Sequence, residues 1–526
     1  MLPFLSTKRN RCKGTVYRDP AWPFHGHLWY KKTLTDNPLE KEALSHMGIP
    51  KKGMDREGIL QRLETFRKGD LDWRSGRVFG YVFDPGEEIM NVGKAAYSAF
   101  LTENGLDFTA FPSLLRLENE LAGMLSDHLG GDDEAVGNFT SGGTESIMLA
   151  VKAARDFCRE RRPEVRAPEI LLPETAHAAF HKAAHYLDVG VVQVPVDPET
   201  FRADVDRVRD AITPNTILLV GSAPSYAHGV VDPIRELGEL ALERGLLLHV
   251  DACMGGFMLP YFRRLGEPVP DFDLSVPGVT SLSVDLHKYA YTPKGASLVL
   301  YRDRGLRKHQ IYACARWTGY SVVNNAVQSS KSGGPMAAAW AVLHYVGDEG
   351  YLEIARRKLA ATKRIAEAVE AMDDLWVLGR PDMCLVAFTS DTVDVFRIVD
   401  EMAKRSWYVQ PAFAFGVSPQ HVHLSVNASN TAWVEPLLVD LKASVAAARK
   451  AGPAALPEGL LETLSSLDPG ALDDEAFGRI LEAVGMTEEG LPEEMAGINS
   501  AMNALPPALR EQLLTAFVND LFRPPW

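Results

Sequence analysis

The stretch "SLSVDLHKYAYTPKGASLVLY" (Ser281–Tyr301) holds two apolar, strand-like runs on either side of a more polar segment. The first run leads directly into His287 and Lys288. A lysine taken out of water loses solvation and its pKa falls, so a lysine at such a position is rare unless it serves a function. Lys288 is therefore a candidate functional residue.

Four earlier runs resemble these two strands, at residues 169–173, 191–196, 216–223 and 246–252. Helical patterns separate them, for example "DPIRELGELALERG". Apolar strands without polar alternation, joined by amphipathic helices, indicate a mainly parallel sheet that is covered on both faces. The predicted fold class is α/β.

Composition and periodicity divide the chain into four predicted parts. Residues 1–90 form an N-terminal arm, of which residues 1–47 show no clear period. The strand and helix alternation falls in a large domain at 91–345. A long helical pattern and further strands then predict a small α+β domain at 346–450, and residues 451–526 are rich in Pro, Leu and Glu and predict a helical extension.

Bulk properties exclude several classes of protein. The 526 residues carry a net charge of −14, which argues against a general nucleic-acid-binding surface. The five cysteines are scattered, which suits a reducing cytoplasm. We expect no metal site and no secretory signal. We also expect no membrane anchor, because no apolar stretch is long enough to cross a bilayer. The expected location is the cytoplasm.

A glycine-rich segment precedes one predicted helix, in "NFTSGGTESIMLAVKAARD" (138–156). Ser141, Gly142, Gly143 and Thr144 lead straight into it, so unpaired amides and hydroxyls could seat a phosphate. A simple helix cap with Glu145 in the first turn explains the same residues equally well. The segment is neither a GxGxxG nor a Walker sequence, which counts against a dinucleotide or nucleoside-triphosphate site.

Two further positions complete a recognisable set. Asp251 ends the strand in "LLLHVDACMGGF" (246–257), where it is either a loop cap or a carboxylate that holds a pyridinium nitrogen protonated. His177 begins a helix and could stack on a cofactor ring, although such a histidine is more often an ordinary surface residue. An anion seat, a buried Asp and a strand-end Lys are the parts that pyridoxal phosphate (PLP) needs.

Several motifs in one order carry a resemblance to a known family: "TSGGTES", "HAAFHKAA", "SAPSYAHGVVDPI", "HVDACMGGF" and "DLHKYAYTPKGASLVLY". The chain resembles the group II decarboxylase superfamily of PLP-dependent enzymes, and within it the sphingosine-1-phosphate lyases, over most of residues 48–450. The resemblance implies a fold-type I enzyme with a seven-stranded sheet, PLP as cofactor, and a homodimer with shared active sites.

The resemblance also assigns roles to single residues. Lys288 would form the Schiff base, Asp251 would pair with the pyridinium nitrogen and His177 would stack on the ring. The phosphate end would be surrounded by Ser141, Gly142, Gly143, Thr144, Ser222 and His287. The residues expected to approach the cofactor from the partner chain are Ser330, Gly333 and Gly334.

The substrate end is predicted from the same resemblance. Lys294, in "TPKG", is a candidate for binding an anionic group of the substrate, and Tyr226 for an acid–base or hydroxyl-binding role. Each also has an ordinary explanation: Lys294 could be a solvated charge in a loop, and Tyr226 could be an aromatic ring that only packs.

The substrate end also departs from the lyase pattern. Asn104 is retained in "NGLDFTAFPS" (104–113), but Asp107 stands where the lyases have a histidine, and Phe83 matches a tyrosine. Lys331 replaces an arginine. A carboxylate that faces a phosphate is repulsive by about a few kcal/mol in a partly buried site, so Asp107 weakens the expectation of a phosphorylated substrate.

Three functions remain open from the sequence. The first is a carbon–carbon lyase that cleaves Cα–Cβ of a 2-amino-3-hydroxy amine, and the second is an amino-acid decarboxylase that uses the same residues. The third is a non-enzymatic assembly protein, which the intact Lys288, Asp251 and glycine seat disfavour. Both enzymes predict a small-molecule amine substrate.

Overall fold

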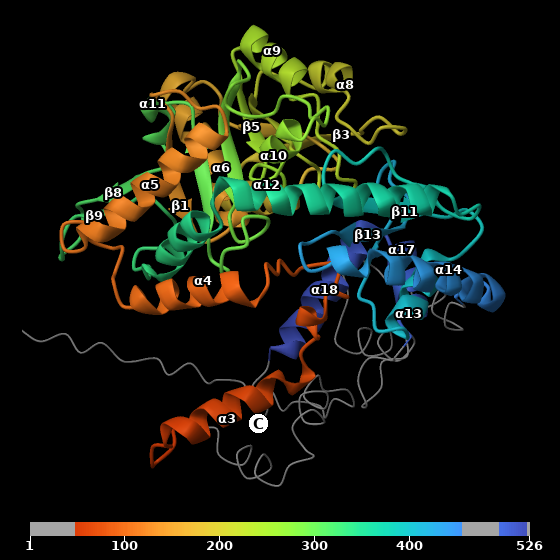
Figure 1. Cartoon of the computed structure of the whole chain (residues 1–526). Coiled ribbons are helices and arrows are strands. Elements are labelled where there is room, and N and C mark those ends of the chain that lie inside the picture. The colour runs from red at the N-terminus through yellow and green to blue at the C-terminus, as the bar shows by residue number, and fades with distance from the viewer. Residues whose placement is uncertain (1–47, 455–493, 523–526) are drawn as a thin grey trace, which may run out of the picture. The chain divides into compact units, whose positions relative to one another are not determined.

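The structure is a computed structural model that describes residues 48–454 and 494–522 (Figure 1). These residues fall into two compact units. Leu71–Ala454 form one unit, and the segments up to Asp70 and from Ala455 onward form the other. The predictions for residues 1–47 and for most of 451–526 lie outside the described residues. The described part of the flanking unit is helical and contains α3 (Arg56–Phe66), η1 (Arg67–Gly69), α17 (Ala496–Ala504) and α18 (Pro507–Leu521).

A seven-stranded sheet forms the centre of the large domain, and its order is β1-β7-β6-β5-β4-β2-β3. Its strands are β1 (Val136–Thr140), β2 (Glu169–Pro173), β3 (Gly190–Val194), β4 (Thr216–Ser222), β5 (Leu247–Asp251), β6 (Val279–Asp285) and β7 (Ser297–Tyr301). Only β7 runs antiparallel to its neighbours β1 and β6. The predicted α/β class and mainly parallel sheet are confirmed.

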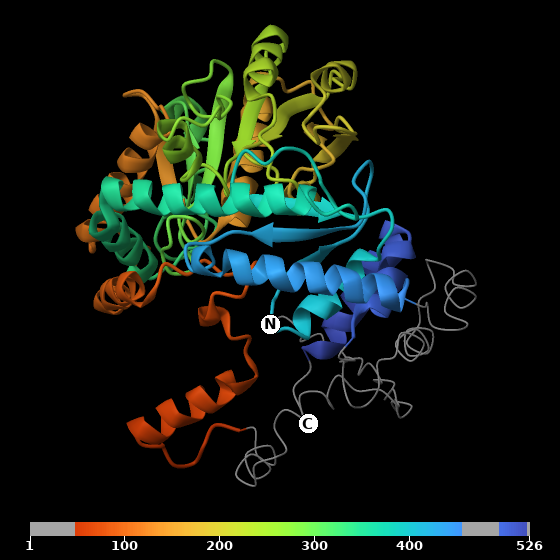
Figure 2. The same ribbon diagram turned by 45° about the vertical axis from the view of Figure 1, so that its right-hand side comes forward.

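Helices cover both faces of this sheet (Figure 2). On one face α6 and α7 pack on Ile170 and Leu172 of β2. On the other face α9 lies so close to β4 that a side chain at Gly221 would meet Ile234 and Leu237. Within the unit Leu71–Ala454, the helices before residue 334 are η2 (Trp73–Ser75), α4 (Glu87–Ala99), α5 (Pro112–His128), α6 (Gly143–Arg161), α7 (Ala179–Leu187), α8 (Val205–Asp210), α9 (Ile234–Arg244), α10 (Leu259–Arg264) and α11 (Arg304–Arg307).

The long helix α12 (Gly334–Glu370) leads from the large domain into the small one and bends at Gly347, whose φ of 63° favours glycine. Its first part packs against α4. A four-stranded antiparallel sheet of order β10-β11-β13-β12 follows. The remaining elements are β10 (Trp376–Val377), β11 (Leu385–Thr389), α13 (Val395–Ala403), β12 (Gln410–Ala412), β13 (His421–Ser425), η3 (Thr431–Trp433) and α14 (Val434–Ala451).

Sequence patterns located the six predicted strands of the large domain to within two residues. No sequence pattern predicted β1 or the short hairpin of β8 (Tyr312–Cys314) and β9 (Val322–Asn324). The predicted domain boundaries stay predictions, although the one at 345/346 lies beside the bend in α12. In the part of the chain that the structure describes, no helix is long and apolar enough to span a membrane.

Candidate active site

The parallel strands end at one edge of the large sheet, and this edge carries the predicted polar residues. Ser222, Asp251 and Ser283 are direct neighbours across β4, β5 and β6. A cavity of about 470 Å³ lies at this edge, as expected for an open α/β sheet. Its lining includes Ser141, Gly142, Gly143, Thr144, His177, Ser222, Tyr226, Asp251, Cys253, Asp285, His287, Lys288 and Lys294.

The glycine-rich segment Ser141–Thr144 packs closely on its neighbours, and Gly143 has no room for a side chain. A Cβ at Gly143 would lie 2.7 Å from Cys253 Sγ and 2.9 Å from Asp285 Oδ2. Glu145 accepts hydrogen bonds from the amide and hydroxyl of Ser141, both at 2.7 Å. In the described part of the chain, the amides of Gly143 and Thr144 have no acceptor, so they are available to an anion in the cavity.

Lys288 forms an ion pair that the sequence reasoning missed. Its Nζ lies 2.9 Å from Asp285 Oδ2, at the end of β6. Burial disfavours the ammonium, but attraction to the carboxylates of Asp285 and, more weakly, Asp251 outweighs burial, and the pKa of Lys288 is raised. The signal for Asp285 was present in the opening stretch, because it is a strand-end carboxylate three residues before the lysine.

Asp251 is buried and held in place by two donors. Its Oδ1 accepts hydrogen bonds from the Cys253 amide at 3.1 Å and from Ser283 Oγ at 3.3 Å. These bonds leave the second carboxylate oxygen available to a partner in the cavity, which suits the predicted pairing with a protonated ring nitrogen.

The two predicted cavity histidines have their Nδ1 atoms engaged by backbone amides. His177 Nδ1 accepts a hydrogen bond from the Ala179 amide at the start of α7, and His287 Nδ1 accepts one from the Ala296 amide, both at 3.1 Å. The rings are thereby fixed in orientation at the cavity wall. Burial, followed by repulsion from Lys294 and Lys288, lowers the pKa of His287 despite the attraction of Asp285.

Lys294 stands at the mouth of the cavity without an acidic partner among the described residues. Its Nζ lies 4.8 Å from the centre of the Phe83 ring and donates to the His287 carbonyl at 3.4 Å. Burial and the charge of Lys288 lower the pKa of Lys294. Lys294 also lines an adjoining cavity of about 280 Å³ that contains Ser330 and Lys331.

Tyr226 reaches the cavity from the loop after β4 and is held by the small domain. Its hydroxyl donates to Gln410 Oε1 at 2.7 Å, and its ring stacks on His423 at 4.4 Å. Burial raises the pKa of Tyr226, so the phenol stays protonated near neutrality. Gln410 gave no signal in the sequence, because its contact with Tyr226 spans 184 positions.

Six predicted residues do not line the main cavity of this chain, and one of them is Phe83, which lies beside the cavity residue Lys294. Asn104 Oδ1 accepts a hydrogen bond from the Leu106 amide, and Asp107 accepts hydrogen bonds from the amide and hydroxyl of Thr109. Both side chains therefore stabilise the local turn in which they lie. Ser330 lines the adjoining cavity instead, while Gly333 and Gly334 pack closely on α5 and α4. The roles of Asn104 and Asp107 toward the substrate stay predictions. So do the roles of Ser330, Gly333 and Gly334 toward the cofactor of a partner chain.

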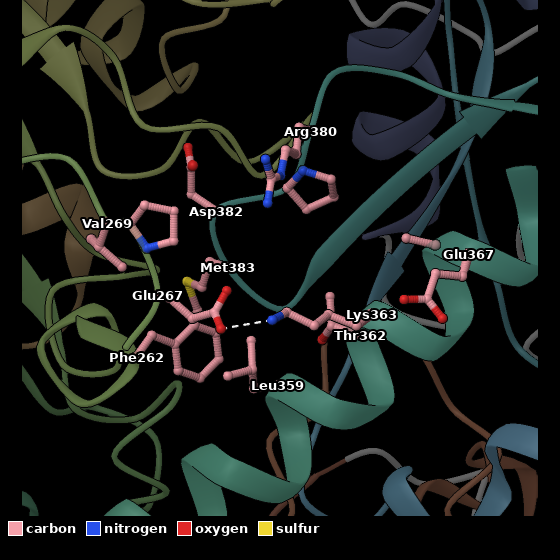
Figure 3. A pocket seen from close by; sticks show the side chains of 13 residues that line it. Phe262, Glu267, Val269, Leu359, Thr362, Lys363, Glu367, Arg380, Asp382 and Met383 are labelled. Carbon is pink, nitrogen blue, oxygen red and sulfur yellow. Dashed lines mark hydrogen bonds and ion pairs between the residues drawn. The ribbon is translucent and has the colours of Figure 1, made fainter. Parts of the chain in front are cut away.

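A second, separate cavity of about 340 Å³ shares no residue with the first (Figure 3). It lies beside the second part of α12, where Lys363 Nζ and Glu267 Oε1 form an ion pair at 2.6 Å. Apolar side chains such as Phe262, Leu359 and Met383 form the rest of its wall. No residue predicted for catalysis lies there.

Comparison with known families agrees with this site. The family model described as the pyridoxal-dependent decarboxylase conserved domain matches residues 39–391. The chain belongs to this family. A sphingosine-1-phosphate lyase of Arabidopsis thaliana is 41% identical over 78% of this chain and 76% of the plant protein. This family member is accordingly a PLP-dependent lyase that is similar to the sphingosine-1-phosphate lyases.

Solved structures extend the comparison. A sphingosine-1-phosphate lyase of Burkholderia pseudomallei is 37% identical, with a TM-score of 0.74 over 78% of this chain and 95% of that chain. A glutamate decarboxylase of Lactobacillus brevis is 19% identical, with a TM-score of 0.70 over 79% of this chain and 98% of that chain, and shares the fold. A second model, a C-terminal putative HTH domain of pyridoxal-dependent enzymes, matches residues 458–520.

The cavity fits the cofactor of this family. The unpaired amides of the Gly143 seat suit the phosphate, the free oxygen of Asp251 suits the ring nitrogen, and Lys288 supplies the amine for covalent attachment. Gly143 has no space for a side chain, because its backbone lies against Cys253 and Asp285 at the strand ends. The predicted cofactor, PLP, is confirmed by family membership.

Proposed function

We propose that the protein cleaves the Cα–Cβ bond of sphingosine-1-phosphate or of a closely related phosphorylated 2-amino-3-hydroxy amine. The observation that carries the proposal is Lys294, a cation at the mouth of the cavity that holds Lys288 and Asp251, with no acidic partner in the part of the chain that the structure describes. The similarity to sphingosine-1-phosphate lyases supports the same substrate class.

The chain's residues divide the work between two ends of the cavity. The amides of Gly143 and Thr144 hold the cofactor phosphate, and Asp251 keeps the ring nitrogen protonated. PLP, when bound, accepts the electron pair that is released at Cα. Lys294 binds the substrate phosphate and so places the substrate's reacting carbons near Lys288 and Tyr226.

One side chain orients the substrate hydroxyl and another moves a proton in this proposal. Tyr226 donates its only proton to Gln410, so its oxygen can accept a hydrogen bond from the substrate 3-hydroxyl and orient it, while the phenol itself stays neutral. Asp285 keeps Lys288 protonated whenever its amine is free, and this ammonium can deliver a proton to Cα.

The Asp107 carboxylate does not oppose this assignment within one chain. It is exposed and bonded to its own turn, and the hydrogen bonds from Thr109 lower its pKa. We also propose that the enzyme is a cytoplasmic homodimer in which Ser330, Gly333 and Gly334 of the partner subunit approach the cofactor. Light scattering of the purified protein tests the dimer.

The deciding experiment supplies the PLP-loaded full chain with sphingosine-1-phosphate and, as a matched control, with sphingosine. We expect a long-chain aldehyde from the phosphorylated amine and at least tenfold less from the control. Equal turnover of both amines would remove the role of Lys294. Release of CO2 from amino acids without any aldehyde would replace the lyase with a decarboxylase.

A further inference from the structure

Lys358 is a fully buried lysine on α12 with no carboxylate partner among the described residues, where its polar neighbour is the Cys384 side chain. Its Nζ lies 3.5 Å from the centre of the Tyr289 ring and 5.6 Å from that of Tyr291. Burial lowers the pKa of Lys358 to about 8. A buried charge without an anion costs stability, so an apolar residue would serve packing better here.

The rings that hold Lys358 belong to the turn that follows the cofactor lysine. Tyr289 comes directly after Lys288, and Tyr291 adopts a left-handed backbone with φ of 60°. A second residue of α12 also contacts this turn: the Tyr351 hydroxyl donates a hydrogen bond to the Ala290 carbonyl at 2.8 Å. The second part of α12 therefore supports the turn from behind.

The contacts continue from this turn to the mouth of the cavity. Tyr289 meets Phe83 edge to face, with ring centres 5.0 Å apart and planes at 85°. The Phe83 ring in turn carries the Lys294 ammonium at 4.8 Å. Two cations and two rings thus form one packed series from α12 to the proposed anion-binding lysine.

We propose that Lys358 is a positioning residue for substrate recognition, which holds Tyr289 and through Phe83 sets the place of Lys294. The inference rests on the proposed function, because Lys294 is taken to bind the substrate phosphate. Attraction between a cation and the face of a tyrosine ring is strongest away from water, and this buried pair meets that condition. Loss of the charge frees the Tyr289 and Phe83 rings to shift and displaces the Lys294 ammonium.

The test uses Lys358→Met, because methionine fills a similar volume without the charge. We expect the KM for sphingosine-1-phosphate to rise about threefold to tenfold while kcat changes less than twofold, and the melting temperature to stay equal or rise. Lys358→Arg, which keeps a cation that can stack on the rings, should restore part of the affinity. Lys358→Gln repeats the test if the methionine variant does not fold.

Lys363→Met is the matched control, because Lys363 lies on the same helix but pairs with Glu267 and is half exposed (Figure 3). It should leave KM and kcat unchanged. In a Lys288→Ala background, where turnover is absent, calorimetry with sphingosine-1-phosphate should show the same loss of affinity for Lys358→Met. A wild-type KM and affinity in Lys358→Met would overturn the proposal. Failure of the wild-type protein to bind this substrate at all would instead refute the proposed function.

Discussion

The cofactor end and the substrate end of the cavity are built in different ways. The cofactor end consists of strand ends and a helix start, with Asp251, Asp285 and Gly143 fixed by the sheet itself. The substrate end consists of side chains from loops, with Tyr226 held by the small domain and Lys294 held on Phe83. The groups that bind the cofactor are thus positioned by the backbone of the sheet and of one helix start. The groups that bind the substrate are positioned by packing between side chains.

The largest expected effect is at the cofactor end. Lys288→Ala removes both the attachment amine and a proton donor, so kcat should fall by at least about 10³-fold. Borohydride reduction followed by peptide mapping should find the cofactor at residue 288 in the wild-type protein and nowhere in the variant. Labelling of a different lysine would show that the cofactor end is misassigned.

The substrate end should give a smaller effect that depends on the ligand. Lys294→Met should lower kcat/KM for sphingosine-1-phosphate about tenfold to a hundredfold, because the substrate phosphate loses its cation. The loss should shrink at high salt, since Lys294 is solvent-accessible and its charge is screened. Steady-state kinetics at two salt concentrations measures this, with sphingosine as a substrate that the change should hardly affect.

Sequence patterns predicted the cofactor end more fully than the substrate end, for a physical reason. Strands and glycine turns repeat local rules, so Asp251, Lys288 and the Ser141–Thr144 segment could be placed from spacing and resemblance. The Lys288–Asp285 pair is also local, but a spacing of three residues at a strand end does not by itself show that the two side chains face each other. Gln410 and Lys358 reach the site over long sequence separations, and only a folded chain shows such contacts.

Acid should destabilise the folded protein through two buried histidines, one of which packs on Tyr226. Burial lowers the pKa of His228 and of His423 from 6.5 to about 3, and His423 stacks on Tyr226. Between pH 3 and 6.5 the unfolded chain therefore binds protons that the folded chain does not, and the free energy of unfolding falls as the pH falls. Each histidine should cost about 2 kcal/mol at pH 5.

Urea unfolding at pH 7 and pH 5 measures this loss. His423→Gln should reduce the difference between the two pH values by about 2 kcal/mol, whereas the exposed His181→Gln should not. An unchanged pH dependence in His423→Gln would mean that this histidine titrates normally in the folded protein.

The smallest expected effect separates two neighbouring glycines at the cofactor end. In Gly143→Ala the new Cβ would lie 2.7 Å from Cys253 Sγ and 2.9 Å from Asp285 Oδ2, so α6 must shift away from the strand ends. In Gly142→Ala the Cβ would meet only His287 Cε1, at 3.5 Å, and its φ of 166° is ordinary extended backbone. We expect PLP affinity to fall about tenfold in the first variant and less than twofold in the second, by equilibrium titration. Equal losses would mean that the seat depends on chain flexibility at both glycines instead of on the close approach of α6 to the strands.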